Sequence, residues 1–502
     1  MKNPLYDSLF APHWGNHSTF LYLPDRDLSF DDFLKLASKF ANTIASFGLV
    51  AGDRLAVQIE KSAEALAVYA ACAQSGVVFL PLNTGYTAAE IEYFLGNSGA
   101  KLMLCDGKAY ESLVDVAQSS GARLAVLNGD GSGDFAEKAK EQSADFQTVE
   151  RDQDDLAAFL YTSGTTGRSK GAMLSQKNLI SNATVLAKAW RFTKADTLLH
   201  ALPIFHTHGL FVACNISLLT SASMIFQAKF NLEDALAALP KSTVMMGVPT
   251  FYTRLLSDAR FNQVLVKHMR LFVSGSAPLL AETHVEFENR SGHKILERYG
   301  MTETNMNTSN PYVGDRRAGT VGMPLEGVEA KVCDAVTGET LANGEIGVLE
   351  VRGDNVFQGY WQMPEKTAEE LREDGFFITG DLATQSDDGY ITIVGRGKDL
   401  IITGGFNVYP KEIETLLDDQ PNVLESAVIG VPHPDFGEGV LGIVVPKSGA
   451  DVEVAQLKAA MSQKLAKFKQ PKKIVIMKEL PRNTMGKVQK NILRDQFAEA
   501  LK

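Results

Sequence analysis

The sequence has few cysteines, and no two of them are close together. Cys72, Cys105, Cys214 and Cys333 are spread over 502 residues, so the spacing of a zinc site or redox pair is absent. Scattered cysteines are typical of a reducing compartment, and we expect a cytoplasmic protein. No N-terminal apolar run indicates a signal peptide, and no run of about 18 apolar residues predicts a membrane span.

The chain also lacks an excess of positive charge. Lysine and arginine number 49 against 60 aspartates and glutamates, which gives a net charge of −11. An acidic surface argues against broad binding to nucleic acid or anionic membranes, although a local site can still bind an anion. Hydrophobic residues make up 45% and charged residues 22%, a composition typical of folded proteins. The length is that of about three domains.

Helix and strand patterns alternate over the first 160 residues and again over 175–300. Apolar side chains at helical spacing predict helices at residues 29–48, 61–75 and 88–98. Short apolar runs predict buried strands at 55–59, 77–80, 102–104 and 124–127. Strands separated by helices predict βαβ units around a parallel sheet. After about residue 315, short β runs with Gly and Asp turns predict a small β-barrel or mixed sheet, and a lysine-rich unit begins near residue 396.

The strongest local signal is the segment 161–171, Tyr-Thr-Ser-Gly-Thr-Thr-Gly-Arg-Ser-Lys-Gly. It follows an apolar stretch and precedes a helix that we expect from about Ser175. Its glycines allow close approach of the backbone, and its hydroxyl and N–H groups can surround phosphate oxygens beside Lys170. It is not a Walker A loop, because the glycine and lysine spacing differs. Composition alone leaves phosphate binding and an ordinary surface loop as equal alternatives.

Four further motifs follow this segment in the order found in one known superfamily. They are YGMTET at 299–304, GDL at 380–382, GRGKDLIITGGFNVYPKEIE at 395–414 and PRNTMGK at 481–487. With these motifs the chain resembles the adenylate-forming superfamily of acyl-CoA synthetases, peptide-synthetase adenylation domains and luciferases. That resemblance implies two half-reactions. A carboxylate attacks the α-phosphate of ATP, giving acyl-AMP and pyrophosphate, and a thiol, here coenzyme A (CoA), then gives a thioester and AMP.

The resemblance also implies an α/β fold in two domains. The N-terminal domain, residues 1–396, would hold βα-layered subdomains and a small β-barrel, and would bind the acid and ATP. A small, mobile α+β domain, residues 397–502, would carry the catalytic lysine and turn about a hinge near Lys398.

The nucleotide site follows from the same motifs. By resemblance, Tyr299 would stack on adenine, Asp381 and Arg396 would hold the ribose, Thr302 would contact the α-phosphate, and Glu303 would bind Mg²⁺. Without the motifs, these would be read as ordinary core, turn or surface residues. The implied nucleotide-binding set is Thr162, Ser163, Gly164, Thr165, Thr166, Gly167, Lys170, Ser276, Ala277, Tyr299, Gly300, Met301, Thr302, Asp381 and Arg396.

Lys487 is the implied catalytic lysine, acting with Thr302 and Glu303. The family lysine bridges the incoming carboxylate and the α-phosphate, where negative charge gathers in the transition state. After the C-terminal domain turns, the loop with Gly404, Gly405 and Phe406 would face the acyl-AMP and guide CoA. A protein lysine acetyltransferase is a further expected partner, because acetylation would remove the charge of Lys487. A mass spectrum without acetylated Lys487 under every growth condition would contradict it.

Two stretches indicate the acid. Residues 207–210 read Thr-His-Gly-Leu, and Met306 follows the Thr-Glu-Thr motif. In both, the chain resembles malonyl-CoA synthetases, in which an arginine pairs with the distal carboxylate of malonate. The resemblance implies Arg254 as this arginine, and a forked guanidinium suits a carboxylate. The implied acid-binding set is Arg254, Thr207, His208, Ser274, Ser276 and Met306.

Several alternatives stay open. Arg254 could be a surface arginine, in which case a short-chain or aromatic acid–CoA ligase is the alternative. The thiol could belong to a carrier protein, although no carrier domain is visible in the sequence. A nucleotide-binding pseudoenzyme or regulatory module is a reading of another class, against which Lys487, Glu303, Asp381 and Arg396 together argue. Malonate and methylmalonate differ by one methyl group, worth about 1–3 kcal/mol, so the sequence does not separate them.

Overall fold

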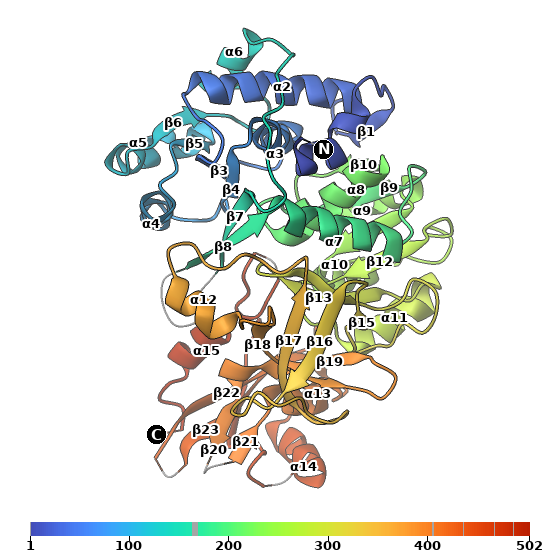
Figure 1. The fold of residues 1–502 in the computed structure, drawn as a ribbon. Coiled ribbons are helices and arrows are strands. Elements are labelled where there is room, and N and C mark those ends of the chain that lie inside the picture. Colours follow the sequence, from blue (N-terminus) through green and yellow to red (C-terminus); the bar gives the residue numbers. More distant parts are fainter. Residues whose placement is uncertain are drawn as a thin grey trace.

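Helices and sheets alternate along the chain in the computed structural model, which describes residues 2–162, 169–403, 406–434, 436–465, 467–484 and 486–501. Helices α2 (Phe30–Ser46) and α6 (Asp134–Lys140) lie at the top of Figure 1, and α14 (Val454–Lys464) lies at its lower end. No helix among these residues is long and apolar enough to cross a membrane.

Two mostly parallel sheets confirm the predicted βαβ architecture. The nine-stranded sheet has the order β15-β14-β13-β12-β11-β9-β10-β1-β2, and the six-stranded sheet has the order β6-β5-β3-β4-β7-β8. The first contains β1 (Thr19–Tyr22), β2 (Asp27–Ser29), β9 (Thr197–His200), β10 (Ser223–Phe226), β11 (Val244–Gly247), β12 (Leu271–Ser274), β13 (Leu296–Met301), β14 (Asn305–Ser309) and β15 (Met323–Pro324). The second contains β3 (Arg54–Gln58), β4 (Val78–Pro81), β5 (Leu102–Cys105), β6 (Arg123–Val126), β7 (Leu156–Thr162) and β8 (Lys170–Ser175).

A four-stranded antiparallel sheet stands where the sequence predicted a small β-barrel or mixed sheet. Its order is β16-β17-β18-β19, and its edge strands do not pair with each other within the described ranges, so the prediction of a barrel is corrected to an open sheet. Four strands are too few, since even small closed barrels use about five or more. The strands are β16 (Val328–Cys333), β17 (Gly347–Gly353), β18 (Phe377–Gln385) and β19 (Ile391–Arg396).

The C-terminal part has its own mixed sheet and its own core. The order β21-β20-β23-β22, with β24 parallel to β23, is built from β20 (Ile401–Thr403), β21 (Phe406–Val408), β22 (Val423–His433), β23 (Gly437–Pro446) and β24 (Lys473–Ile476). Two clusters of buried apolar side chains here contain only residues from 401 onward. A separate core is what a separate domain requires.

Helices connect the strands, and several end where the sequence predicted. Gly76 and Gly99 end α3 and α4 with φ of 73° and 62°, values that suit glycine. The remaining α-helices are α1 (Pro4–Leu9), α3 (Ala63–Ser75), α4 (Ala88–Ser98), α5 (Tyr110–Ser119), α7 (Gln176–Ala189), α8 (Asn215–Thr220), α9 (Leu232–Ala238), α10 (Pro249–Leu256), α11 (Ala281–Ser291), α12 (Pro364–Glu370), α13 (Pro410–Asp418) and α15 (Lys490–Gln496). Shorter turns are η1 (Ala11–His13), η2 (Gly107–Ala109), η3 (His208–Cys214), η4 (Leu239–Lys241) and η5 (Gly397–Asp399).

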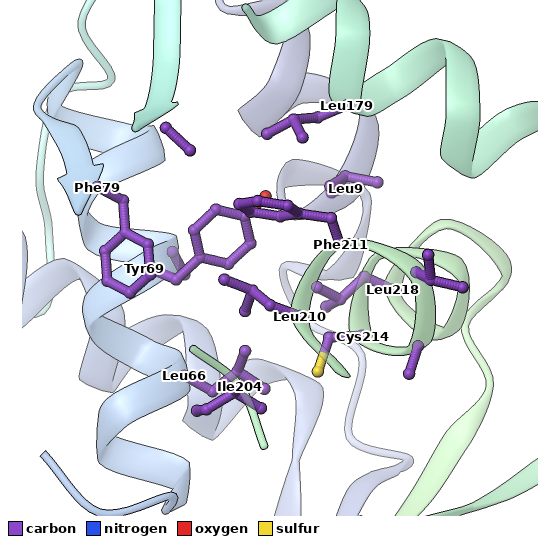
Figure 2. Close-up of a cluster of buried hydrophobic side chains, with 14 of the residues drawn as sticks. Leu9, Leu66, Tyr69, Phe79, Leu179, Ile204, Leu210, Phe211, Cys214 and Leu218 are labelled. Carbon is purple, nitrogen blue, oxygen red and sulfur yellow. The ribbon is translucent and has the colours of Figure 1, made fainter. Parts of the chain in front are cut away.

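The largest hydrophobic core joins the two parallel sheets. The ring of Tyr69 on α3 lies 5.4 Å from that of Phe79 and 5.8 Å from that of Phe211, between ring centroids. Figure 2 shows these rings with Leu66 and Ile204, between α3 and the helix that carries Phe211. These contacts pack the six-stranded sheet and its helix α3 against the segment that follows β9.

Strand β8 was not predicted. The sequence predicted a helix from about Ser175, and α7 begins at Gln176 with Ser175 as its N-cap, but β8, which pairs antiparallel with β7 ahead of this helix, was missed. Gly171 makes this close packing possible, because a Cβ there would lie 2.2 Å from Cζ of Phe159. The glycine and Lys170 weaken the apolar pattern by which a strand is recognised.

Candidate active site

Three residues of the predicted nucleotide site meet around one carboxylate. Asp381 of β18 and Arg396 of β19 are paired across their sheet, with Arg396 Nε 2.7 Å from Asp381 Oδ1. The Tyr299 hydroxyl of β13 donates to Asp381 Oδ2 at 2.5 Å. Burial, aided by the Asp381 charge, raises the pKa of Tyr299 well above its usual value, so the phenol keeps its proton. This group offers the ring, carboxylate and guanidinium that an adenosine requires.

Glu303 occupies a buried position in the turn after β13. Its side chain is 5% exposed, and its Oε1 lies 3.0 Å from the Tyr360 hydroxyl, which lies 2.6 Å from Glu370 Oε2. Burial raises the pKa of Glu303. Lys170 forms its ion pair with Glu370 and not with Glu303, and its Nζ lies 3.1 Å from Glu370 Oε2. The same Nζ lies 4.0 Å from the centroid of the Tyr360 ring.

The donor set of Glu303 fits Mg²⁺. No group of three or more metal-ligating side chains occurs among the residues that the structure describes. Mg²⁺ does not need such a group, because one or two carboxylates suffice when substrate phosphates and water complete its octahedron. A buried carboxylate with no ion pair in the described part of the chain suits this arrangement.

Lys487 is held on a short hairpin that closes against the N-terminal part. Its backbone N–H donates to Asn483 Oδ1 at 2.9 Å, and its carbonyl accepts from the Asn483 N–H at 3.0 Å. The neighbouring Thr484 Oγ1 lies 3.2 Å from Asn83 Nδ2, and a Cβ at Gly486 would lie 3.3 Å from Thr250 Oγ1. The hairpin is thereby docked on the loop that follows β4 and on the first turn of α10.

The amine of Lys487 lies within the charge field of the nucleotide group. Burial and, after it, the positive charge of Arg396 lower the pKa of Lys487 to about 8, while the charge of Asp381 opposes this shift. The residue as a whole is exposed on the hairpin. The structure therefore brings Lys487, Asp381, Arg396 and Tyr299 together, as the motifs implied.

A second group of buried polar atoms lies around the π-helical turn η3. His208 Nδ1 lies 3.2 Å from Ser276 Oγ, while His208 Nε2, Thr207 Oγ1 and Ser274 Oγ have no hydrogen-bond partner within the described ranges. Wide π turns are frequent at functional sites. Met306 is buried on the neighbouring strand β14. Four predicted acid-site residues and Met306 thus lie on adjoining elements.

Arg298 is the residue that the sequence reasoning missed. It lies on β13, is 3% exposed, and its Nε and Nη2 atoms have no partner among the described residues. Burial lowers the pKa of Arg298 to about 9. Burial also lowers the pKa of His206 and of His208, and the charge of Arg298 adds to both shifts. A Cβ at residue 275 would lie 2.4 Å from Arg298 Cζ, so Gly275 makes room for the guanidinium. An unpaired buried guanidinium is rare and points to an anionic ligand.

Arg254 lies elsewhere. It is exposed on α10 and lines a cavity of about 440 Å³ whose walls include none of the five residues grouped around Arg298. A signal for Arg298 was present in the sequence, since a charged residue in the buried strand Ile-Leu-Glu-Arg-Tyr-Gly needs a partner or a function.

The remaining predicted site residues lie in strands, turns and loops, or outside the described residues. Thr162 ends β7, Ala277 and Thr302 are half-buried in turns, and Met301 Sδ lies 3.9 Å from the Tyr299 hydroxyl. At Gly300 a Cβ would lie 1.9 Å from the carbonyl oxygen of Asn305, so only glycine fits. The predicted phosphate residues Ser163, Gly164, Thr165, Thr166 and Gly167 lie outside the described residues, as do Gly404 and Gly405. Phe406 is exposed and stacks on Phe468, and Lys398 lies exposed in η5.

The chain is similar to known proteins over most of its length. The chain is 36% identical over 483 residues to a malonate–CoA ligase of Arabidopsis thaliana, covering 89% of this chain and 78% of that protein. It is 33% identical over 488 residues to a feruloyl-CoA synthase of an Amycolatopsis species, covering 96% of each. ATP-bound MatB from Rhodopseudomonas palustris is 53% identical over 100% of both chains, with a TM-score of 0.98, against 0.86 for its apo form.

Family models match both parts of the chain. The model described as AMP-binding enzyme matches residues 11–361, and the model of the AMP-binding enzyme C-terminal domain matches residues 412–487. The first match alone includes Tyr299 and Glu303, and the second ends on Lys487. The chain belongs to the AMP-binding enzyme family.

Proposed function

We propose that the protein is an ATP-dependent malonate–CoA ligase, which forms malonyl-CoA through malonyl-AMP and releases AMP and pyrophosphate. The observation that carries the choice of acid is the buried, unpartnered guanidinium of Arg298 beside Thr207, His208 and Ser274. A dicarboxylate activated at one end keeps a second charge, which needs a cation in this dry environment. The likeness to a malonate–CoA ligase supports the same substrate.

In this proposal Arg298, not Arg254, pairs with the distal carboxylate. Its guanidinium is already desolvated, and the hydroxyls of Ser274 and Thr207 and the ring of His208 offer further hydrogen bonds to the acid. Arg254 keeps an exposed position, where a carboxylate would stay hydrated. Thr207 and Met306 would bound the α-carbon, and methylmalonate would have to fit an extra methyl group there.

The first half-reaction uses the nucleotide group. Asp381 and Arg396 hold the ribose, Tyr299 packs on the adenine, and Lys487 lies between the reacting carboxylate and the α-phosphate. A carboxylate oxygen forms a bond to the α-phosphorus while the bond to pyrophosphate breaks. Lys487 stabilises the negative charge that gathers there. Mg²⁺, held by Glu303, would neutralise charge on the departing pyrophosphate.

The second half-reaction requires Lys487 to leave. The CoA sulfur, having lost its proton, forms a bond to the acyl carbon, and the bond to AMP breaks. We propose domains of 1–396 and 397–502 with the hinge at Lys398, because β19 ends at Arg396 in one sheet and β20 begins at Ile401 in another. Rotation there would remove the hairpin of Lys487 and bring Phe406 towards the acyl-AMP.

Substrate preference tests this proposal. With ATP, Mg²⁺ and CoA, we expect AMP release with malonate to exceed that with acetate, butyrate or benzoate by about 10² or more, because those acids leave Arg298 unpaired. EDTA should abolish release. The feruloyl-CoA synthase relative makes aromatic acids the second candidate, and faster turnover with benzoate or ferulate than with malonate would overturn the assignment.

The pH dependence of adenylation should follow the protonation state of the Lys487 amine. The amine is charged below a pKa of about 8 and neutral above it, so kcat/KM for malonate in ATP–pyrophosphate exchange should be constant below pH 8 and fall about tenfold per pH unit above it. Lys487→Arg keeps its charge and should give a lower but flat profile over pH 7–10. A wild-type profile that stays flat to pH 10 would contradict the role.

Two further proposals rest on smaller observations. Cys72, Cys105, Cys214 and Cys333 are all free and buried, which supports a reducing compartment such as the cytoplasm. Acetylation of Lys487 by a lysine acetyltransferase stays a prediction, and it would remove the charge on which the first half-reaction depends.

A further inference from the structure

The cavity that Arg254 lines is also lined by a lysine that no motif singled out. Its volume is about 440 Å³, and apolar side chains form most of its wall, namely Val57, Ile59, Phe79, Leu82, Ile204 and Val248. Lys61, the residue before the N-cap of α3, also lines it. Figure 2 labels Ile204 and Leu66 among the buried side chains of the large hydrophobic cluster.

Lys61 is oriented by His200, at the end of β9. Lys61 Nζ lies 2.8 Å from both His200 Nδ1 and the His200 carbonyl oxygen. His200 Nε2 lies 2.8 Å from the Gly209 carbonyl, which can only accept, so Nε2 carries the hydrogen and Nδ1 accepts from Lys61. The amine also lies 4.2 Å from the ring centroid of Phe226. An ammonium has three N–H groups, and these contacts with His200 use two of them.

No carboxylate pairs with Lys61 in the described part of the chain. The adjacent Glu60 forms its ion pair with Lys108, at 2.7 Å. Burial lowers the pKa of Lys61 to about 7, and the nearby Cys214 opposes this shift weakly. A methionine at position 61 would be about as long as the lysine and could fill the same apolar wall, so packing alone does not explain the amine. The remaining N–H group is therefore available to an acceptor inside the cavity.

The hairpin that carries Lys487 forms part of the wall of the cavity. Arg482, Asn483, Thr484 and Gly486 all contribute to its lining. When Lys487 is in place for adenylation, these residues occupy one side of the cavity. The cavity therefore opens on this side only when the hairpin leaves, which the proposed function assigns to the thioester half-reaction.

We propose that Lys61 is a positioning residue of that half-reaction, donating a hydrogen bond to an amide carbonyl of the CoA arm as the arm lies in this cavity. This inference rests on the proposed function. The arm of CoA is a narrow, mostly apolar chain with amide groups and a terminal thiol, which matches an apolar cavity with one fixed donor. The exposed cations Lys229 and Arg254 at the same cavity suit a molecule whose other end carries phosphates. Lys61 acts on the position of the thiol and takes no part in bond formation.

Separate assays of the two half-reactions test this role. Lys61→Met should leave malonate-dependent ATP–pyrophosphate exchange within twofold of the wild type. It should raise KM for CoA in thioester formation about tenfold or more, the loss expected for a charged donor. Lys61→Arg, which keeps a donor, should recover part of the affinity. The matched control is Lys194→Met, a lysine in an exposed turn, which should change neither assay.

Two results would overturn the inference. One is an unchanged KM for CoA in Lys61→Met, and the other is a parallel loss of exchange and thioester formation, which would indicate a structural role. Failure of the proposed function is a different result, since the wild type itself would then show no malonate-dependent exchange.

Discussion

Arg298→Leu should lower kcat/KM for malonate in ATP–pyrophosphate exchange by about 10²–10³, the effect of removing one partner of a buried charge pair. Leucine fills the space on β13 but leaves the distal carboxylate of malonate buried without a cation. The loss should be specific to dicarboxylates. Acetate, which has no distal charge, should react in the variant at least as fast as in the wild type.

The same variant should be more stable in the absence of ligands. Arg298 is 3% exposed and its Nε and Nη2 atoms have no partner within the described ranges, so the free protein bears the cost of a buried charge. Its replacement by an apolar side chain should raise the free energy of unfolding by about 1–3 kcal/mol. Thermal unfolding of the ligand-free proteins measures this. Malonate added to the ATP-bound proteins should raise the midpoint further in the wild type only.

Arg254→Leu decides between the two arginines. It removes an exposed guanidinium on α10, so malonate-dependent exchange, which needs no CoA, should stay within about threefold of the wild type. A loss of 10² or more in Arg254→Leu, with Arg298→Leu unaffected, would restore the assignment made from the resemblance. A stability that falls in Arg298→Leu would contradict the view that the guanidinium is uncompensated.

The contrast between these residues shows what could be predicted from the sequence. Motif order identified Tyr299, Asp381, Arg396 and Lys487, and the structure brings them together from three parts of the fold: β13 of the nine-stranded sheet, the neighbouring strands β18 and β19 of the antiparallel sheet, and the C-terminal hairpin. Helices such as α2, α3 and α4 could be predicted because their apolar spacing and their caps agree.

The acid pocket could not be predicted in the same way. Arg298 and Ser274 lie on neighbouring strands, β13 and β12, while His208 lies on η3, so only the fold places them together. Strand alternation puts Arg298 on the opposite face from Glu297 and Tyr299, and sequence alone does not say which face meets a ligand. The role of Lys61 could not be predicted either, because it depends on the contact with His200, which is 139 residues away in the sequence.

The prediction of a small β-barrel was wrong for a related reason. Short β runs with glycine turns predict antiparallel pairs, but closure depends on whether the edge strands meet. Here β16 contacts β14 and β15 of the large sheet, so one edge of the small sheet lies against another element. The local pattern of residues 328–396 is compatible with both outcomes.

Lys487→Ala should lower adenylation by about 10²–10³ while leaving thioester formation from supplied malonyl-AMP and CoA within about threefold. The amine lies beside Arg396 and Asp381 on a hairpin that also blocks one side of the 440 Å³ cavity, so it serves one half-reaction and must be absent from the other. Single-turnover assays with malonyl-AMP separate the steps. Lys478→Ala, in the same lysine-rich stretch but exposed on a turn, is the matched control and should match the wild type in both.

Equal losses in both half-reactions would contradict this division of labour, since they would mean that Lys487 stays at the reacting atoms throughout. A selective loss of adenylation would instead tie the charge on the hairpin to one conformation. In that case the same movement that withdraws the cation clears the path for the thiol, so the two half-reactions exclude each other sterically as well as chemically. The double variant Lys61→Met, Lys487→Ala should then show additive losses, each confined to its own step, because the two amines act at different times.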